Sequence, residues 1–239
     1  MNFSHKSTIQ EIEKRFDNDV ERFSNLETGQ ATTLDASFNM ELITDCIASV
    51  YPNLNHVLDI GCGAGNYDVK LLQKTTPKSF SLVDLSNPML IRAKERLAEN
   101  TSVDIFTFQG DFRSVDLKEA HFDVIIATAV LHHLREDQDW ESAFKKLYSL
   151  LKPGGSLWIF DLVHQAEDRL QEFIYKNRYG AYLSSLKDDQ YRDHVFDYIE
   201  KEDSPRPLLF QLDLLKKVGF QSVDVLHKNL CFASYVAFK

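Results

Sequence analysis

Cysteine is scarce in this chain of 239 residues, which contains only Cys46, Cys62 and Cys231. An odd number of widely spaced cysteines, with no Cys-x-x-Cys pair, excludes a disulfide framework and a zinc knuckle. We therefore predict that the protein works in a reducing, cytoplasmic compartment and that it binds no metal.

Long hydrophobic runs are absent as well. The longest apolar runs have the length of a strand, well short of the roughly 20 residues that cross a bilayer. Residues 1–16 contain no apolar core of the kind found in a signal peptide. The sequence therefore predicts a protein without a membrane partner.

Positive charge is also in short supply: 27 Lys and Arg stand against 36 Asp and Glu, which gives a formal net charge of −9. Residues 1–50 hold 4 basic and 9 acidic side chains, and no segment of the chain is basic. Proteins that bind nucleic-acid phosphates normally carry a basic surplus or a basic stripe. We expect no nucleic-acid partner.

What the chain does contain is a regular alternation of strand and helix patterns between residues 55 and 163. Its apolar runs are continuous rather than alternating, which is typical of parallel strands buried on both faces. We predict strands at 56–61, 79–86, 103–111, 122–131 and 156–163, helices at 66–75, 88–100 and 140–151, and a turn at 152–155.

The flanking segments are predicted to complete and cover this sheet. Apolar residues spaced three and four apart predict a helix over 8–25, a second helix follows over 37–50, and a third runs over 207–220. Two strands of an edge hairpin end the chain. Within a single structural domain we distinguish a helical cover at 1–50, a core at 51–163, a helical aromatic lid at 164–206, and a C-terminal helix and β-hairpin at 207–239.

The most informative motif follows the first predicted strand and reads Asp59-Ile60-Gly61-Cys62-Gly63-Ala64-Gly65. A strand, a glycine turn and a helix present free backbone N–H groups to a ligand, and glycine allows the ligand to come close. A dinucleotide-binding turn requires glycine at relative positions 1, 3 and 6. The sixth position here is Asn66, so the dinucleotide pattern fails at its last position.

This motif resembles motif I of the class I S-adenosylmethionine-dependent methyltransferases, in the small-molecule branch with methyltransferase domains 12 and 25. The later motifs of that family follow in order: Asp84 ends the second strand, Gln109-Gly110-Asp111-Phe112 follows the third, and Leu151–Gly155 precedes the fifth. The resemblance implies a Rossmann-like, doubly wound α/β sheet of seven mostly parallel strands with an antiparallel C-terminal strand, helices on both faces and a helical lid.

The resemblance also implies S-adenosylmethionine as the cofactor, S-adenosylhomocysteine as the product and a small-molecule methyl acceptor. Asp84 would accept hydrogen bonds from the ribose hydroxyls, Asp111 would face the adenine amino group, and Phe112 would pack on the ring. The family pattern assigns cofactor contacts to Asp59, Gly61, Cys62, Gly63, Gly65, Asp84, Leu85, Met89, Asp111, Phe112 and Ala127. Purely structural roles are also possible for three of these residues. Asp84 could be the N-cap of a helix, Asp59 could support the loop, and Met89 could belong to the hydrophobic core.

The candidate catalytic residues are His132 and His133, which come directly after the fourth predicted strand. A base is needed when the acceptor is a hydroxyl, an ammonium or an acidic carbon, and histidine suits that task near neutral pH. Adjacent histidines cannot both face one point, so at most one acts and the other orients the loop. Asp161 and His164, after the fifth strand, are weaker candidates.

Rival functions remain open at this stage: an NAD(P)-dependent oxidoreductase on a related sheet, a tRNA or protein methyltransferase, and a non-catalytic binding module. Asn66 weighs against the first and the missing basic segment against the second. The acidic residues 1–50 lie beside the expected mouth of the site, which favours a small neutral or cationic acceptor. Neither the acceptor atom nor the oligomeric state is readable from the sequence.

Overall fold

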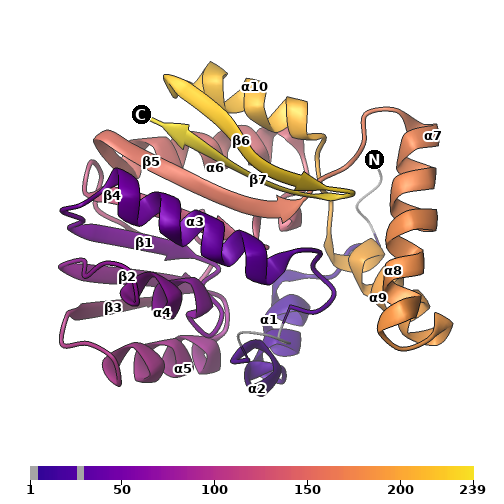
Figure 1. Cartoon of the computed structure of the whole chain (residues 1–239), viewed down its shortest axis with the longest axis horizontal. Helices are drawn as coiled ribbons and strands as arrows, with labels where there is room; N and C mark the ends of the chain where they lie inside the picture. The colour runs from indigo at the N-terminus through magenta and orange to yellow at the C-terminus, as the bar shows by residue number, and fades with distance from the viewer. Residues whose placement is uncertain (1–4, 26–29) are drawn as a thin grey trace.

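A seven-stranded sheet in the order β3-β2-β1-β4-β5-β7-β6 forms the centre of the protein (Figure 1). The computed structural model describes residues 5–25 and 30–239. Strands β1 to β5 are mutually parallel, whereas β7 is antiparallel to both β5 and β6. The strands are β1 (His56–Ile60), β2 (Ser79–Asp84), β3 (Asp104–Gln109), β4 (Phe122–Thr128), β5 (Leu151–Leu162), β6 (Ser222–Asn229) and β7 (Phe232–Phe238).

Helices cover both faces of the sheet. Successive residues of β1 serve opposite faces: Val57 packs with α3, α4 and α5, whereas Leu58 packs with α6 and α10 (Figure 1). The described helical segments are α1 (Ile9–Asp17), α2 (Val20–Phe23), α3 (Ala36–Val50), α4 (Asn66–Leu72), α5 (Asn87–Ala98), η1 (Leu131–His133), α6 (Asp137–Leu150), α7 (Asp168–Gln171), η2 (Glu172–Tyr179), α8 (Gly180–Leu186), α9 (Asp189–Glu202) and α10 (Leu208–Val218). The predicted fold class, a doubly wound sheet with an antiparallel C-terminal strand, is confirmed.

Two local predictions were wrong. The helix predicted over 8–25 breaks into α1 and α2 because the Asn18 side chain donates to the Lys14 carbonyl and ends the first helix. The turn predicted at 152–155 belongs to β5, whose pairing with β4 jumps from Phe122–Leu151 to Val124–Ser156. The residues between Leu151 and Ser156 form an irregularity in the strand, where Gly154 has a φ of +78°.

The lid helices α7 to α9 lie beyond the carboxyl ends of the parallel strands, on the same side as α1 and α2 (Figure 1). The Tyr179 hydroxyl donates to the Thr32 carbonyl at 2.8 Å, which joins the lid to the N-terminal cover. The Ser204 N–H donates to the His132 carbonyl at 2.6 Å, which joins the lid to the loop after β4. These contacts place two covers over one edge of the sheet.

Among the described residues, every helix is too short or too polar to pass through a lipid bilayer.

Candidate active site

The glycine loop after β1 has the backbone geometry of a ligand cradle. Gly61, Gly63 and Gly65 have φ values of +65°, +52° and +73°, a region that side chains with a Cβ rarely adopt. A Cβ on Gly61 would lie 2.6 Å from Val130 Cγ2, whereas a Cβ on Gly63 would meet no atom within 4 Å. The space above Gly63 is therefore open to a ligand.

Polar side chains hold this loop in place from two sides. The Gly63 N–H donates to Asp84 Oδ2 at 2.8 Å, which ties the loop to the end of β2. The Arg96 guanidinium donates to the Ala64 carbonyl at 2.5 Å and to Asn66 Oδ1 at 2.7 Å. Asp84 ends β2 and Arg96 lies in α5, so both contacts come from the neighbouring β2–α5 unit.

Three cavities meet at this edge of the sheet. The outer cavity, of about 240 Å³, extends from Gly61 and Asp84 to Asp111, Phe112 and Arg113. The loop cavity, of about 100 Å³, is lined by Phe16, Phe23, Gln30, Gly61, Cys62, Gly63, Asp84, Leu85, Met89, Ala129, Val130 and His133, among others. The lid cavity, of about 90 Å³, is lined by Arg15, Phe16, His132, His133, Asp161, Tyr179, Tyr198 and Asp203, among others.

Most of the cofactor residues proposed from the sequence line the outer or loop cavity. Asp84 does so while accepting the Ser86 N–H at 2.9 Å, but Ser86 itself caps helix α5, so the N-cap alternative for Asp84 is wrong. Asp111 faces the outer cavity and forms a two-pronged pair with Arg113, whose charge contributes to lowering the pKa of Asp111 against the opposing effect of burial. Asp84 and Asp111 therefore both border the outer cavity at the carboxyl edge of the sheet.

Three of the residues proposed from the sequence lie outside these cavities. Ala127 is buried inside β4, and the cavity wall is built by Ala129 and Val130 just beyond it. Gly65 packs against Ala93, where a Cβ would lie 3.1 Å from the Ala93 Cβ. Asp59 is buried behind the loop. Ala129 and Val130 fell inside the strand predicted over 122–131, whereas β4 ends at Thr128, so a more accurate strand end was the signal that could have found them.

Asp59 and Asp68 form a buried carboxyl pair behind the loop. Three of their four oxygens have no hydrogen-bond donor among the described residues. Burial and the neighbouring charge of Asp68 raise the pKa of Asp59 well above its usual value, and burial raises the pKa of Asp68 to about 7. The two carboxyls therefore hold a proton between them, because two adjacent carboxylates repel each other in a buried site.

Replacing Asp68 with Asn is expected to make the protein more stable at neutral pH. Folding raises the pKa of this pair, so the native state binds the extra proton and wild-type stability falls as pH rises from about 4 to about 7. An Asn amide donates to Asp59 without titrating, and the expected gain at pH 7 is on the order of 2 kcal/mol.

Urea unfolding of wild type and Asp68→Asn across that pH range measures the difference. Asp224→Asn, at an exposed position of β6, is the control and should follow the wild-type curve. If the wild-type and Asp68→Asn curves stay parallel across the range, the shared proton is ruled out.

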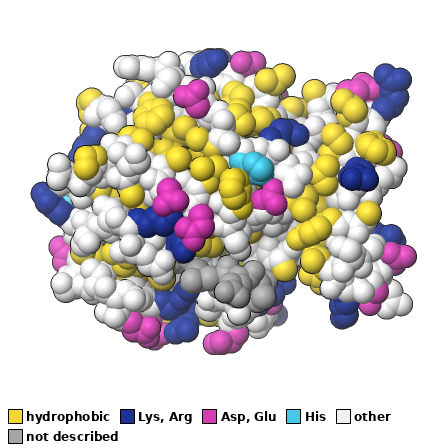
Figure 2. All heavy atoms as spheres, in the orientation of Figure 1, with side chains coloured by type: hydrophobic (Ala, Val, Ile, Leu, Met, Phe, Trp, Pro, Cys, Tyr) yellow, Lys and Arg dark blue, Asp and Glu magenta, His cyan; other side chains and the backbone are white. Residues whose placement is uncertain are grey.

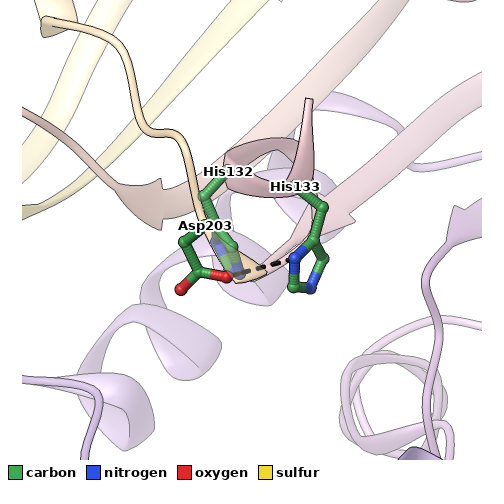
Figure 3. Close-up of side chains that lie close together, drawn as sticks. All are labelled: His132, His133 and Asp203. Atoms are coloured by element: carbon green, nitrogen blue, oxygen red, sulfur yellow. Dashed lines mark ion pairs between the residues drawn. The ribbon is translucent and has the colours of Figure 1, made fainter. Parts of the chain in front are cut away.

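A buried network of two histidines and two carboxylates lines the lid cavity. His132 Nδ1 bonds to Asp161 Oδ1, and Asp161 Oδ2 accepts the Leu131 N–H at 2.7 Å. His132 Nε2 lies 3.6 Å from Asp203 Oδ1, and His133 Nδ1 lies 3.1 Å from the same oxygen (Figure 3). Burial opposes charge on His132, but Asp161 and Asp203 prevail and raise its pKa to about 9.

The weaker candidate Asp161 thus joins His132, whereas His164 does not line the lid cavity. Asp203 was missed by sequence reasoning because it stands in a charged stretch at the end of α9 that looks like an ordinary solvated helix end. No short-range pattern links Asp203 to His132, 71 residues earlier. Only the packing of the lid on the sheet brings these residues together.

An ion pair holds the N-terminal cover against the lid. Arg15 in α1 donates to both carboxylate oxygens of Glu202 in α9, at 2.8 Å from Nε and 2.5 Å from Nη2. Lys6 donates to the Glu200 and Asp203 carbonyls at 2.6 and 2.5 Å. Ile9, Ile12 and Phe16 of α1 line the cavities. The contacts of Arg15 and Lys6 with the lid therefore keep the N-terminal cover over the site.

A doubly wound sheet with an inserted antiparallel β7, and a glycine-lined cavity at its carboxyl edge, define a nucleotide-type cofactor site on a Rossmann-like fold. Residues 57–155 match a family model described as a methyltransferase domain. A Geobacillus protein named as an uncharacterized methyltransferase is 30% identical over 65% of this chain and 68% of its own length. The chain belongs to the class I S-adenosylmethionine-dependent methyltransferases, and S-adenosylmethionine is its cofactor.

Two further relatives describe the breadth of this similarity. A carboxy-S-adenosyl-L-methionine synthase of Chromohalobacter salexigens is 29% identical over 77% of this chain and 68% of its own length. The solved structure of phosphoethanolamine N-methyltransferase 2 of Haemonchus contortus, in complex with S-adenosyl-L-methionine, aligns with a TM-score of 0.62 at 18% identity. That alignment covers 92% of this chain and 46% of the Haemonchus enzyme, and it shows a shared fold.

The residues present fit the cofactor. The open space above Gly63 leaves room for a ligand against the backbone, and Asp84 presents a carboxylate at the rim of the same cavity. Apolar side chains, among them Met89 and Leu85, complete the wall. This combination of open space against the backbone, one carboxylate and apolar surface suits a ligand with a ribose and a flat base.

Proposed function

We propose that this chain transfers the methyl group of S-adenosylmethionine to a small-molecule acceptor held in the lid cavity. The observation that supports the proposal is that the lid cavity and the loop cavity share part of their walls. His133 lines all three cavities, and Phe16, Phe23, Gln30 and Ala129 line both the loop cavity and the lid cavity. A ligand in the lid cavity therefore lies next to one in the loop cavity, which is the arrangement that a direct transfer requires.

The bound cofactor supplies a methyl group on a sulfonium, which passes to the acceptor by in-line displacement. In this proposal the backbone of Gly61, Cys62 and Gly63 and the side chain of Met89 hold the methionine end. Asp84 accepts hydrogen bonds from the ribose. The adenine end lies against Leu85, Asp111 and Phe112, in the outer cavity.

His133 is the residue we propose to contact the reacting group of the acceptor and to hold or remove its proton. It is the residue whose ring borders both the cofactor cavities and the lid cavity. Its ring also meets the edge of Phe16, with ring centroids 6.3 Å apart, so the cover fixes its orientation. His132 instead orients the loop through Asp161.

The acceptor is proposed to be small and either neutral or cationic. Two carboxylates, Asp161 and Asp203, are buried in the wall of the lid cavity, and the Arg15 guanidinium is engaged by Glu202. On the face drawn in Figure 2, Lys and Arg side chains stand apart and are interspersed with Asp and Glu, which is unlike the basic stripe of a nucleic-acid-binding protein.

Methyl transfer from cofactor labelled with tritium on its methyl group tests the proposal. The full chain is incubated in parallel with an ultrafiltered small-molecule cell extract, with bulk tRNA and with bulk protein. We expect label to enter the small-molecule fraction and to depend on the enzyme. Label confined to tRNA or protein would overturn the proposed acceptor class, and absence of transfer to all three with cofactor binding intact would favour a binding module.

A further inference from the structure

We propose that His132, His133 and Asp203 bind one divalent transition-metal ion, of the zinc or ferrous class, in the wall of the lid cavity. The three side chains come from two distant segments, the short helix η1 and the residue after α9, and they point toward one another (Figure 3). This inference departs from the sequence expectation of no metal, which considered cysteine spacing and not residues joined by the lid.

The spacing of the three donor atoms suits a shared ion. His133 Nδ1 and His132 Nε2 lie 3.1 and 3.6 Å from Asp203 Oδ1, and all three atoms lie within 4.8 Å of one another. Metal bonds to imidazole nitrogen and carboxylate oxygen are about 2.0–2.2 Å long, so ligands at a tetrahedral angle stand roughly 3.4 Å apart. Small rotations of the side chains would close the set around an ion.

The second shell of such a site is already built. Metal-bound histidines almost always donate their other ring N–H to a carboxylate or carbonyl, which fixes the ring. Here His132 Nδ1 bonds to Asp161, so that Nε2 is directed toward Asp203. Asp161 is itself fixed, because it also accepts the N–H groups of Leu131 and Leu162, each at 2.7 Å.

The nitrogen of His133 that faces Asp203 gives a further sign. His133 Nδ1 is buried and makes no hydrogen bond within the described part of the chain, although it lies 3.1 Å from Asp203 Oδ1. The contact is close enough for an ion pair but not aligned for a hydrogen bond. A buried polar atom without a hydrogen bond is costly, and coordination of an ion would satisfy it.

The charges also balance around an ion. Binding of an ion releases the proton of His132, because a metal ligand must be deprotonated. The two neutral imidazoles and the Asp203 carboxylate then leave a divalent ion with one excess positive charge, which the Asp161 carboxylate offsets from the second shell. Arg15 is engaged by Glu202 and adds no net charge to this balance. Buried charges that are paired in this way avoid most of the cost of removing them from water.

Two histidines and one carboxylate leave further coordination positions open. Because the three ligands line the lid cavity, these positions face the acceptor. This part rests on the proposed function: the acceptor would bind the ion through an oxygen or nitrogen atom, which the ion polarises so that it loses its proton more readily. His133 would then act as a ligand of the ion rather than as a free base.

Cobalt(II) titration of the full chain without cofactor or acceptor tests the site, with visible absorption as the readout and zinc(II) calorimetry as confirmation. We expect one ion per chain, and an affinity at least 100-fold lower in His133→Gln and in Asp203→Asn. Asp161→Asn is expected to weaken binding by about 10–100-fold through loss of the second shell. Asp203→Asn could lower the melting temperature, because Asp203 belongs to the lid. In that case His133→Gln decides the test, because it leaves the lid residues unchanged.

His121→Gln is the matched control. His121 stacks on His56 with ring centroids 4.3 Å apart, away from the cavities, and is another place where two imidazoles meet. Its loss should leave the cobalt spectrum unchanged. The proposal is overturned if wild type takes up no ion, or if only His121→Gln reduces uptake. Binding of S-adenosylhomocysteine and methyl transfer are measured on the same samples, so failure of the proposed function is seen separately from failure of the metal site.

Discussion

Replacing Asp84 with Asn is expected to weaken binding of S-adenosylmethionine and S-adenosylhomocysteine about 100-fold without unfolding the protein. The carboxylate stands at the rim of the outer and loop cavities, where it is proposed to accept hydrogen bonds from the ribose hydroxyls. A hydrogen bond to a charged group is worth about 1.5–3 kcal/mol, and each 1.4 kcal/mol is a factor of about ten in affinity. Asn keeps the shape but loses the charge and half of the acceptor capacity.

Calorimetric titration with S-adenosylhomocysteine measures the Asp84 effect. Asp104→Asn is the control, because Asp104 is exposed at the opposite end of the neighbouring strand β3. Its affinity should equal that of wild type, and thermal unfolding of both variants confirms their fold. Equal affinity of Asp84→Asn and wild type would rule out the proposed contact between Asp84 and the ribose.

Replacing Gly63 with Ala is expected to reduce cofactor affinity by at least about tenfold. The added methyl group meets no protein atom within 4 Å, so the space that it enters belongs to the loop cavity. In the proposed complex the cofactor occupies that space, and the methyl group would hold it away from the backbone. The left-handed φ of +52° also costs an alanine about 1–2 kcal/mol of stability.

Gly154→Ala separates the two effects of the Gly63 change. Gly154 has a φ of +78° and also has nothing within 4 Å of its ideal Cβ, but it lies in the irregular start of β5 and lines none of the three cavities. We expect both variants to lose similar stability and only Gly63→Ala to lose affinity. If Gly63→Ala and Gly154→Ala lost the same affinity, backbone strain rather than contact with the cofactor would explain the loss in Gly63→Ala.

The sheet was predictable because its signal is local. Continuous apolar runs such as Val124–Ala127 alternate with segments of helical spacing along the core and mark buried parallel strands. The glycine loop that lines the loop cavity was predictable for the same reason, since Gly61, Gly63 and Asp84 lie at fixed sequence distances from the strands that carry them. Their side of the site is built from residues near in sequence to a strand end.

The lid side of the site could not be predicted in the same way. Asp203, Glu202 and Tyr179 reach the site only because the lid folds back over the sheet, and their sequence surroundings are those of exposed helices. Asp59 shows that a matching motif does not fix the direction of a side chain. Its position matches the family motif, but its carboxyl is buried against Asp68 and supports the loop from behind. Motif spacing identifies a position, whereas packing decides which way a side chain faces.

The most direct test of the account is a calorimetric titration of the full chain with S-adenosylhomocysteine and, separately, with NAD⁺ and NADH. Asn66 in place of the last glycine of a dinucleotide turn, together with the family membership, predicts saturable binding of one S-adenosylhomocysteine per chain and no binding of either dinucleotide. Binding of NAD⁺ or NADH without binding of S-adenosylhomocysteine would contradict the account.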